Sequence, residues 1–294
     1  MVSSTYTNHI LPLVVVVVAW SEGSRIRRPM ASSVASLDAS SPSLALRIGC
    51  VAAVALVRLA VGTQPHSGQD NYHGSAVAYG GDYEAQRHWM EVTVHLPVGE
   101  WYYYDVDYWG LDYPPLSAYQ SWLCGKLSQL MVGQASVALV TSRGYEDPTH
   151  KAFLRASVVL LDLVCYGTAA WRLTRPAARH SQASLMMFAQ VMLQPSILLI
   201  DHGHFQYNTV ALGMSLWSFY CCTHPASARN WLWPMLGAVC FCGALSFKQM
   251  TLYYAPAIFA YLLGRCVPHA TTGVRASGTT THELRHFLLL GAAN

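Results

Sequence analysis

The acidic and aromatic segment from Gly81 to Pro115 holds the residue types best suited to chemistry on a sugar. A carboxylate can take the proton of a hydroxyl group, and flat aromatic faces stack on a sugar ring. The carboxylates are Asp82, Glu84, Glu91, Glu100, Asp105, Asp107 and Asp112, and the aromatic residues include Trp89 and Tyr113. A solvated loop with aromatic anchors at a membrane interface has the same composition. Composition alone favours this second interpretation, so the surrounding elements must decide.

Asp82 is the carboxylate with the most specific position. It follows Gly80 and Gly81, a turn that leads into a helix, and Asp is a favoured N-cap residue. The sequence thus predicts either a helix cap or a general base for an acceptor hydroxyl. The two roles are compatible, because a carboxylate at a helix start near a membrane surface is partly desolvated and more basic.

The other carboxylates of the segment are less specific. Asp112 precedes Tyr113 and two prolines, so we expect a cap or turn residue ahead of a helix that begins at Leu116. Asp105 and Asp107 either bind sugar hydroxyls or are solvated. Each remains a candidate for binding substrate.

A second polar motif, Asp-His-Gly-His-Phe-Gln-Tyr-Asn, spans 201–208. His-x-His beside a carboxylate can chelate a metal, but two histidines two residues apart on a helix face opposite ways, and no third histidine completes a site. We therefore predict no metal site. Hydrogen bonding of His202, His204 and Gln206 to a polar ligand, or packing against the acidic segment, is favoured.

Two charged residues lie at or within apolar stretches. Lys248 stands at the mouth of one stretch, where it can hold a lipid phosphate as a point charge or extend to the head groups. Asp162 lies in the middle of another stretch and must find a partner, for which Arg155 and Arg58 are the candidates.

The composition predicts an all-α polytopic membrane protein. Of 294 residues, 53% are hydrophobic and 11% charged, whereas a soluble domain carries about 25% charged residues. Spans of about 20 apolar residues satisfy their own backbone as helices. The expected spans are 44–61, 153–173, 183–200, 209–222, 231–247, 250–267 and an incomplete one at 287–294, with a large loop at about 63–152 and a disordered or signal-like extension at 1–43.

Several other classes of protein are disfavoured. The net charge is only +3 and there is no basic tract, so nucleic acid is not an expected partner. The eight cysteines contain no CxxC pair and no zinc-like spacing, and they lie mostly in apolar stretches. They are expected to pack as small apolar residues.

The distribution of basic residues predicts the orientation. With the N-terminus in the cytosol, ten of the 18 Lys and Arg face the cytosol, and ten of the 15 Asp and Glu lie between Gly62 and Lys151 on the other side. This orientation requires the helix within 116–140 to lie along the membrane. The acidic segment, the motif at 201–208 and Lys248 then emerge on the same face.

Five stretches together resemble the endoplasmic-reticulum glucosyltransferases that use dolichyl phosphate glucose. They are GGDYEAQRHWMEVTVHLP, YWGLDYPPLSAYQSWLCGKL, TSRGYEDPTHKAF, ILLIDHGHFQYN and FKQMTLYYAP, and the resemblance runs from about Leu44 to Gly264. Enzymes adding the first and the second glucose share this family. The runs Glu-Ala-Gln-Arg-His-Trp and Lys-Gln-Met favour the branch that adds the first glucose, with the second-glucose branch as the alternative.

The resemblance implies a GT-C fold with a lumenal active site in a multi-pass protein of the endoplasmic reticulum membrane. It implies transfer of glucose from dolichyl phosphate glucose to a high-mannose oligosaccharide on diphosphodolichol, forming an α-1,3 linkage with inversion, and no metal or other cofactor. It makes Asp82 the base. Glu84, Arg87, His88 and Trp89 of the same motif become candidates for binding substrate, with the residues named above.

The sequence also departs from this family. Its members are longer, and we expect a His-Glu-Lys motif that helps to hold the donor phosphate to be missing from this chain. The chain alone is therefore expected to show no transfer, and residues 1–43 have no counterpart in the family. A non-catalytic membrane subunit remains an alternative. A lipid transporter is disfavoured, because only Asp162 lies deep within a span.

Overall fold

A computed structural model describes residues 43–65, 81–174 and 182–266. In these ranges the chain forms helices and turns without a strand, so the all-α prediction is confirmed. The expectations for residues 1–42, for the 66–80 part of the large loop and for everything after 266, including the span at 287–294, fall outside the described residues.

Three helical stretches are long and apolar enough to cross a membrane: Leu44–Gly62, Pro148–Thr174 and Ala183–Gly203. The first is helix α2 (Leu44–Gly62). The second joins α5 (Pro148–Leu161), the π-helical turn η4 (Asp162–Gly167) and α6 (Thr168–Thr174), and the third includes α7 (Gln182–Met192), α8 (Pro195–Ile197) and the π-helical turn η5 (Leu198–Gly203).

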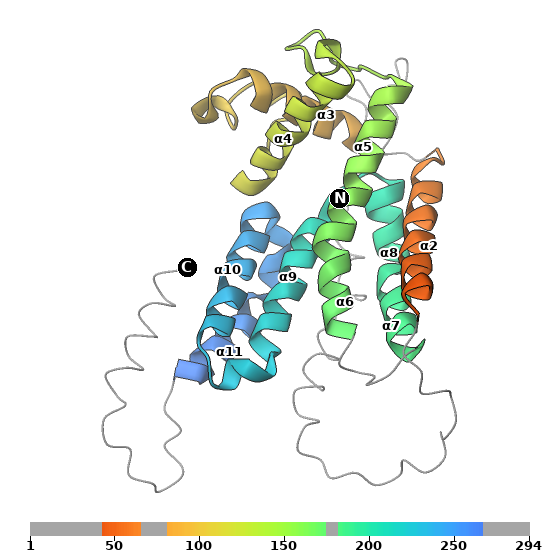
Figure 1. Ribbon diagram of the computed structural model, residues 1–294. Coiled ribbons are helices and arrows are strands. Elements are labelled where there is room, and N and C mark those ends of the chain that lie inside the picture. Colours follow the sequence, from red (N-terminus) through yellow and green to blue (C-terminus); the bar gives the residue numbers. More distant parts are fainter. Residues whose placement is uncertain (1–42, 66–80, 175–181, 267–294) are drawn as a thin grey trace, which may run out of the picture. The chain divides into compact units, whose positions relative to one another are not determined.

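Shorter helices occupy the other expected spans. They are α9 (Asn208–Thr223), α10 (Leu232–Phe247) and α11 (Ala255–Cys266), which follows the 3-10 turn η7 (Gln249–Tyr254). Helices α9 and α10 pack along each other, as Figure 1 shows. Which of these helices cross a membrane stays a prediction, as do the limits of the domains.

Close contact between α9 and η4 depends on a glycine. A Cβ atom on Gly213 would lie 2.5 Å from the carbonyl carbon of Cys165. A side chain in place of the glycine hydrogen would not fit at this distance unless the backbone moved. The second long helical stretch and α9 therefore meet backbone to backbone.

The large loop contains helices of its own. Helices α3 (Asp82–His95) and α4 (Pro115–Met131) pack together, with short 3-10 turns at η2 (Val98–Glu100) and η3 (Gln134–Val137). A Cβ atom on Gly125 of α4 would lie 3.0 Å from the carbonyl oxygen of Met90 on α3. The position of α4 along the membrane stays a prediction.

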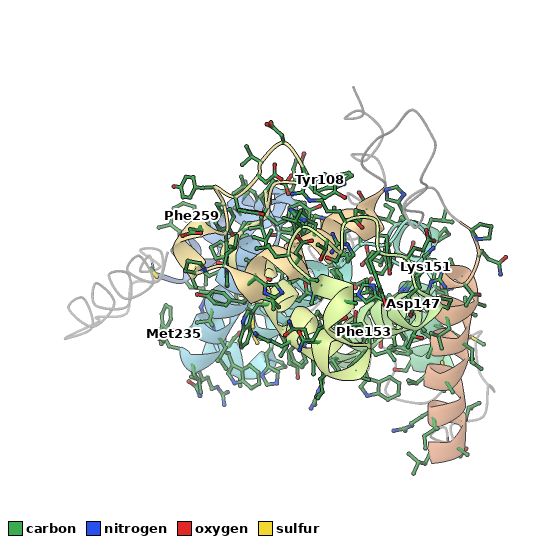
Figure 2. All side chains as sticks on the ribbon, turned by 90° about the horizontal axis from the view of Figure 1, so that it is seen from above. Tyr108, Asp147, Lys151, Phe153, Met235 and Phe259 are labelled. Atoms are coloured by element: carbon green, nitrogen blue, oxygen red, sulfur yellow. The ribbon has the colours of Figure 1, made fainter. Side chains whose placement is uncertain are left out.

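The expected capping roles of Asp82 and Asp112 are wrong. The N-cap of α3 is Gly81, and Asp82 is the first helical residue with no capping bond from its side chain. Pro114 is the N-cap of α4. Asp147 is a true cap: it accepts from the amides of Thr149 and His150 at the start of α5, where Figure 2 labels it near Lys151.

Candidate functional site

The carboxylate of Asp82 meets the turn that joins η5 to α9. Its Oδ2 accepts a hydrogen bond from Nε2 of Gln206 and lies 2.9 Å from Nε2 of His204. The Asp82 side chain is 24% exposed and that of His204 is 46% exposed. The acidic segment and the motif at 201–208 thus meet at one accessible carboxylate.

Gln206 connects this carboxylate to a cation and a phenol. Its Oε1 accepts from Nζ of Lys248 at 3.0 Å and from the hydroxyl of Tyr113 at 3.3 Å. The Lys248 ammonium also lies 4.3 Å from the centroid of the Tyr113 ring, a cation–π geometry. Five of the predicted site residues, Asp82, Tyr113, His204, Gln206 and Lys248, therefore gather from three separate parts of the chain.

The ammonium of Lys248 is held in a partly buried place among carboxylates. Burial lowers the pKa of Lys248 to about 8, although Asp201, Asp82 and Asp112 all act to raise it. Lys248 still carries its charge at neutral pH, which suits it to an anionic group of a ligand.

The turn that carries His204 and Gln206 is fixed by buried polar contacts. The Asp201 carboxylate accepts from Nδ2 of Asn208 and from the amide of Thr209, both at 2.7 Å. His202 turns the other way, and its Nε2 lies 2.9 Å from Oδ2 of Asp162.

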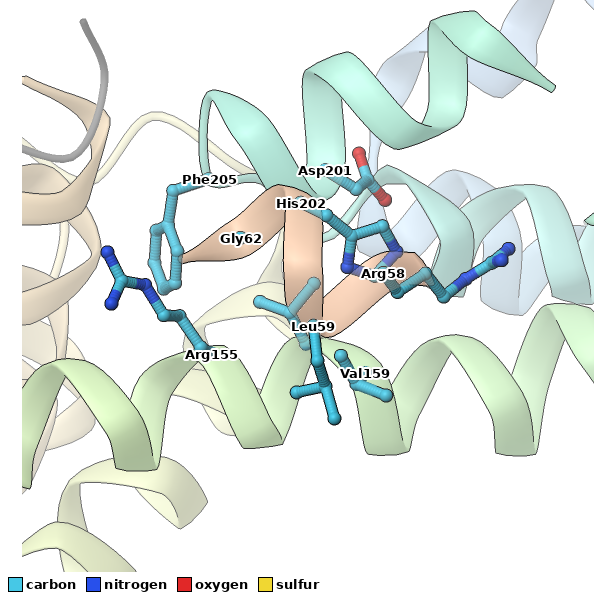
Figure 3. A pocket seen from close by; sticks show the side chains of 9 residues that line it. Arg58, Leu59, Gly62, Arg155, Val159, Asp201, His202 and Phe205 are labelled. Carbon is cyan, nitrogen blue, oxygen red and sulfur yellow. The ribbon is translucent and has the colours of Figure 1, made fainter. Parts of the chain in front are cut away.

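Asp162 also pairs with the fully buried Arg58, one of its two expected partners. Figure 3 shows Arg58 on α2 beside His202, while Arg155 lies on α5. One ion network therefore connects α2, η4 and η5. It anchors the start of the turn that reaches Asp82.

Four predicted substrate residues of α3, Glu84, Arg87, His88 and Trp89, are buried. Arg87 donates to both Glu84 and Glu91, and its Nη2 lies 2.9 Å from Oε2 of Glu91. His88 contacts Glu91 at 3.2 Å, and the Trp89 indole donates to the carbonyl of Trp109 at 2.9 Å. These contacts hold the loop together, and direct binding of substrate by the four stays a prediction.

The remaining candidates lie on exposed turns. Asp105 has a positive φ of 39° and pairs with Arg143, which stacks over Tyr108. Asp107 and Asp112 are exposed. Among the described contacts, none joins Asp105, Asp107 or Asp112 directly to the Asp82 carboxylate, although Asp112 is close enough to affect the pKa of Lys248.

Comparison with known proteins identifies the family. The sequence profile of the ALG6, ALG8 glycosyltransferase family matches residues 54–294, which is most of the chain. The chain belongs to the ALG6, ALG8 glycosyltransferase family. The resemblance seen in the sequence motifs is confirmed, and with it the GT-C fold class.

Curated relatives carry one name. The chain is 44% identical over 201 residues to the dolichyl pyrophosphate Man9GlcNAc2 alpha-1,3-glucosyltransferase of Gallus gallus, covering 66% of this chain and 38% of that protein. The protein of that name from Saccharomyces cerevisiae is 43% identical over 218 residues, covering 71% and 37%. A probable one from Caenorhabditis elegans is 37% identical over 275 residues, covering 87% and 51%. The chain thus spans about half of these relatives' length or less.

In this member of the ALG6, ALG8 family, a pocket lies beside the site. Tyr113 and Lys248 line it together with Gln86, Gln120 and three other residues, Ser117, Tyr207 and Phe247. The sequence did not single out Gln86, although its place one helical turn after Asp82 puts both residues on the same face of α3. Within the described ranges, no three metal-ligating side chains gather.

Proposed function

We propose that this chain carries the base of an enzyme that transfers glucose from dolichyl phosphate glucose to lipid-linked Man9GlcNAc2, forming an α-1,3 linkage. The observation that supports it is the cluster of Asp82, Gln206 and Lys248 in a chain of this glycosyltransferase family. The relatives' names specify Man9GlcNAc2, which favours addition of the first glucose over the second.

The chemistry follows from two charges on either side of Gln206. Asp82 takes the proton of the acceptor hydroxyl as that oxygen bonds to C1 of glucose. The bond from C1 to the phosphate oxygen breaks, and dolichyl phosphate leaves with the electron pair. A phosphate is a good leaving group, so no acid is required, and one displacement inverts C1. Lys248 neutralises the phosphate charge from the far end of the Gln206 amide.

The membrane setting belongs to the same proposal. The donor and acceptor are lipids, and three stretches of the chain are long and apolar enough to span a bilayer. The bias of basic residues favours a multi-pass protein of the endoplasmic reticulum with Asp82, His204 and Lys248 on the lumenal side. A cysteine-free version with single cysteines at exposed positions, labelled from one side of sealed microsomes, tests this orientation.

Transfer by the Asp82→Asn variant tests the base. The whole chain is expressed in yeast membranes, alone and extended by the part of the S. cerevisiae relative that follows the matched region. Loss of a general base costs about 100-fold or more in rate. Glu100→Gln, which changes an exposed carboxylate of η2, is the matched control and should keep full activity. Transfer by Asp82→Asn within tenfold of the parent would exclude Asp82 as the base, and no transfer by either parent protein would contradict the function.

A further inference from the structure

His204 and Gln206 reach the same oxygen atom from alternate positions of one turn. Both Nε2 atoms approach Oδ2 of Asp82, His204 at 2.9 Å. The His204 contact is a nitrogen–oxygen approach at ion-pair distance, and because a carboxylate oxygen only accepts, a hydrogen bond across it would be donated by Nε2. Among the contacts of the described residues, Oδ1 of Asp82 has no hydrogen-bond donor.

The residue between them has an unusual backbone. Phe205 has a φ of 76°, in the left-handed region that a bulky residue rarely adopts. Such a conformation persists only where the surroundings enforce it, and it is concentrated at functional sites. Phe205 is buried and packs edge-on against Tyr83 and Tyr207, with ring centroids 5.5 and 5.8 Å away.

The backbone on both sides of Phe205 is also held. The amide of His204 donates to the carbonyl of Leu199 at 2.7 Å, and that of Gln206 donates to the carbonyl of Asp201 at 3.1 Å. The second of these bonds closes the turn around Phe205. The left-handed residue thus lies in a closed turn from which both flanking side chains reach Asp82 at the start of α3.

From this geometry we infer that His204 is a positioning residue for Asp82, donating through Nε2 to Oδ2 so that Oδ1 faces the acceptor hydroxyl. The inference rests on the proposed function and adds to it a residue that does not touch the reacting atoms. Gln206 shares the task but is also tied to Lys248 and Tyr113, whereas the His204 side chain makes its sole polar contact among the described residues with this carboxylate.

The test compares His204→Ala with His204→Gln in the extended protein, with donor and acceptor varied separately. A hydrogen bond to a charged group corresponds to roughly a ten- to hundredfold change in rate. We expect His204→Ala to lower kcat by that factor with KM for the acceptor unchanged. His204→Gln, which keeps an N–H donor, should recover most of kcat. His224→Ala, which removes a histidine after the far end of α9, should keep kcat.

The outcomes separate this inference from the proposed function. If the parent transfers glucose and Asp82→Asn does not, but His204→Ala keeps kcat within twofold, the positioning role is wrong and the function stands. A rise in KM alone would make His204 a substrate ligand and overturn the role. Equal losses in His204→Ala and His204→Gln would show that donation to Asp82 is not its task. Absence of transfer by the parent would contradict the function itself.

Discussion

Replacing Arg87 by Met should unfold the large loop at a much lower temperature. The Arg87 guanidinium is fully buried and donates to Glu84, Glu91 and Ser142, whose side chains are also buried. Met fills similar space but leaves two buried carboxylates without their cation. Removing one partner of a buried ion pair costs about 3–5 kcal/mol. Because about 1 kcal/mol shifts the melting temperature of a chain of this size by roughly 2–4 °C, we expect a fall of roughly 6–20 °C.

The two carboxylates keep other donors, which sets the lower end of that range. Glu84 accepts from the Tyr108 hydroxyl at 2.9 Å, and Glu91 accepts from the amide of Val140 at 2.6 Å. Burial alone raises the pKa of Glu91, but His88, Arg87 and the Val140 amide together lower it to about 2. A carboxylate with a lowered pKa stabilises the fold above its unfolded value of 4.5, and that stability is lost as the pH falls toward 2. Arg87→Met should move this loss to higher pH.

The assay is thermal unfolding in detergent, followed with a dye that fluoresces on reaction with thiols. Cys124 of α4 is buried in the core that α4 shares with α3 and becomes reactive when the loop opens. Arg143→Met is the matched control, because its pair with Asp105 is about one-third exposed and such pairs contribute about 0–1 kcal/mol. A fall of less than about 2 °C for Arg87→Met, or an equal fall for Arg143→Met, would refute the reasoning.

Three further predictions follow from other contacts. Binding of a short-chain polyprenyl phosphate glucose should weaken as the pH rises through about 8, because Lys248 then loses its charge. The Lys248→Arg variant should bind this ligand equally on both sides of that pH. Parallel pH curves of binding for the two proteins would contradict the prediction. Gly213→Ala should lower the melting temperature by the equivalent of about 1–3 kcal/mol, because its Cβ meets the η4 backbone, whereas Gly264→Ala, with open space, should not. Arg58→Met should destabilise the protein by about 3–5 kcal/mol, and adding Asp162→Leu should restore most of that loss. The measurement is a double-mutant cycle by thermal unfolding. If the losses of the two single variants simply add in the double variant, the two residues are not a coupled pair.

The meeting of Asp82, Gln206 and Lys248 was accessible from the sequence. Gln206 and Lys248 stand at the ends of apolar stretches, Asp82 lies in the loop between two of them, and counting basic residues predicted all three on one face of the membrane. Membrane topology therefore predicts that the three residues lie on the same side, but it gives no distance between them. It does not predict that Gln206 stands between the two charges, because this depends on the left-handed backbone at Phe205. The sequence does not indicate this conformation, because phenylalanine is not one of the residues, glycine and asparagine, that usually adopt it.

The roles of the α3 residues were not accessible. The spacing of Glu84, Arg87 and Glu91 fits pairs on one helix face, but spacing does not say whether that face meets substrate or protein. The deciding partners, Tyr108 and Ser142, lie 24 residues from Glu84 and 55 from Arg87. Their contacts depend on how the loop folds back, which local patterns do not contain.

The pair of Arg58 and Asp162 also sets an order of events during synthesis. The two residues are separated by 104 positions, so Arg58 emerges from the ribosome long before its counter-charge exists. A lone arginine at the centre of a transmembrane helix costs about 2.5–3.5 kcal/mol on insertion scales. Arg58 lies near the end of α2, where its side chain can stay with the lipid head groups until the second long helix arrives. The turn that carries His204 is tied to this pair through His202, so the placement of the site depends on Arg58 and Asp162 having met.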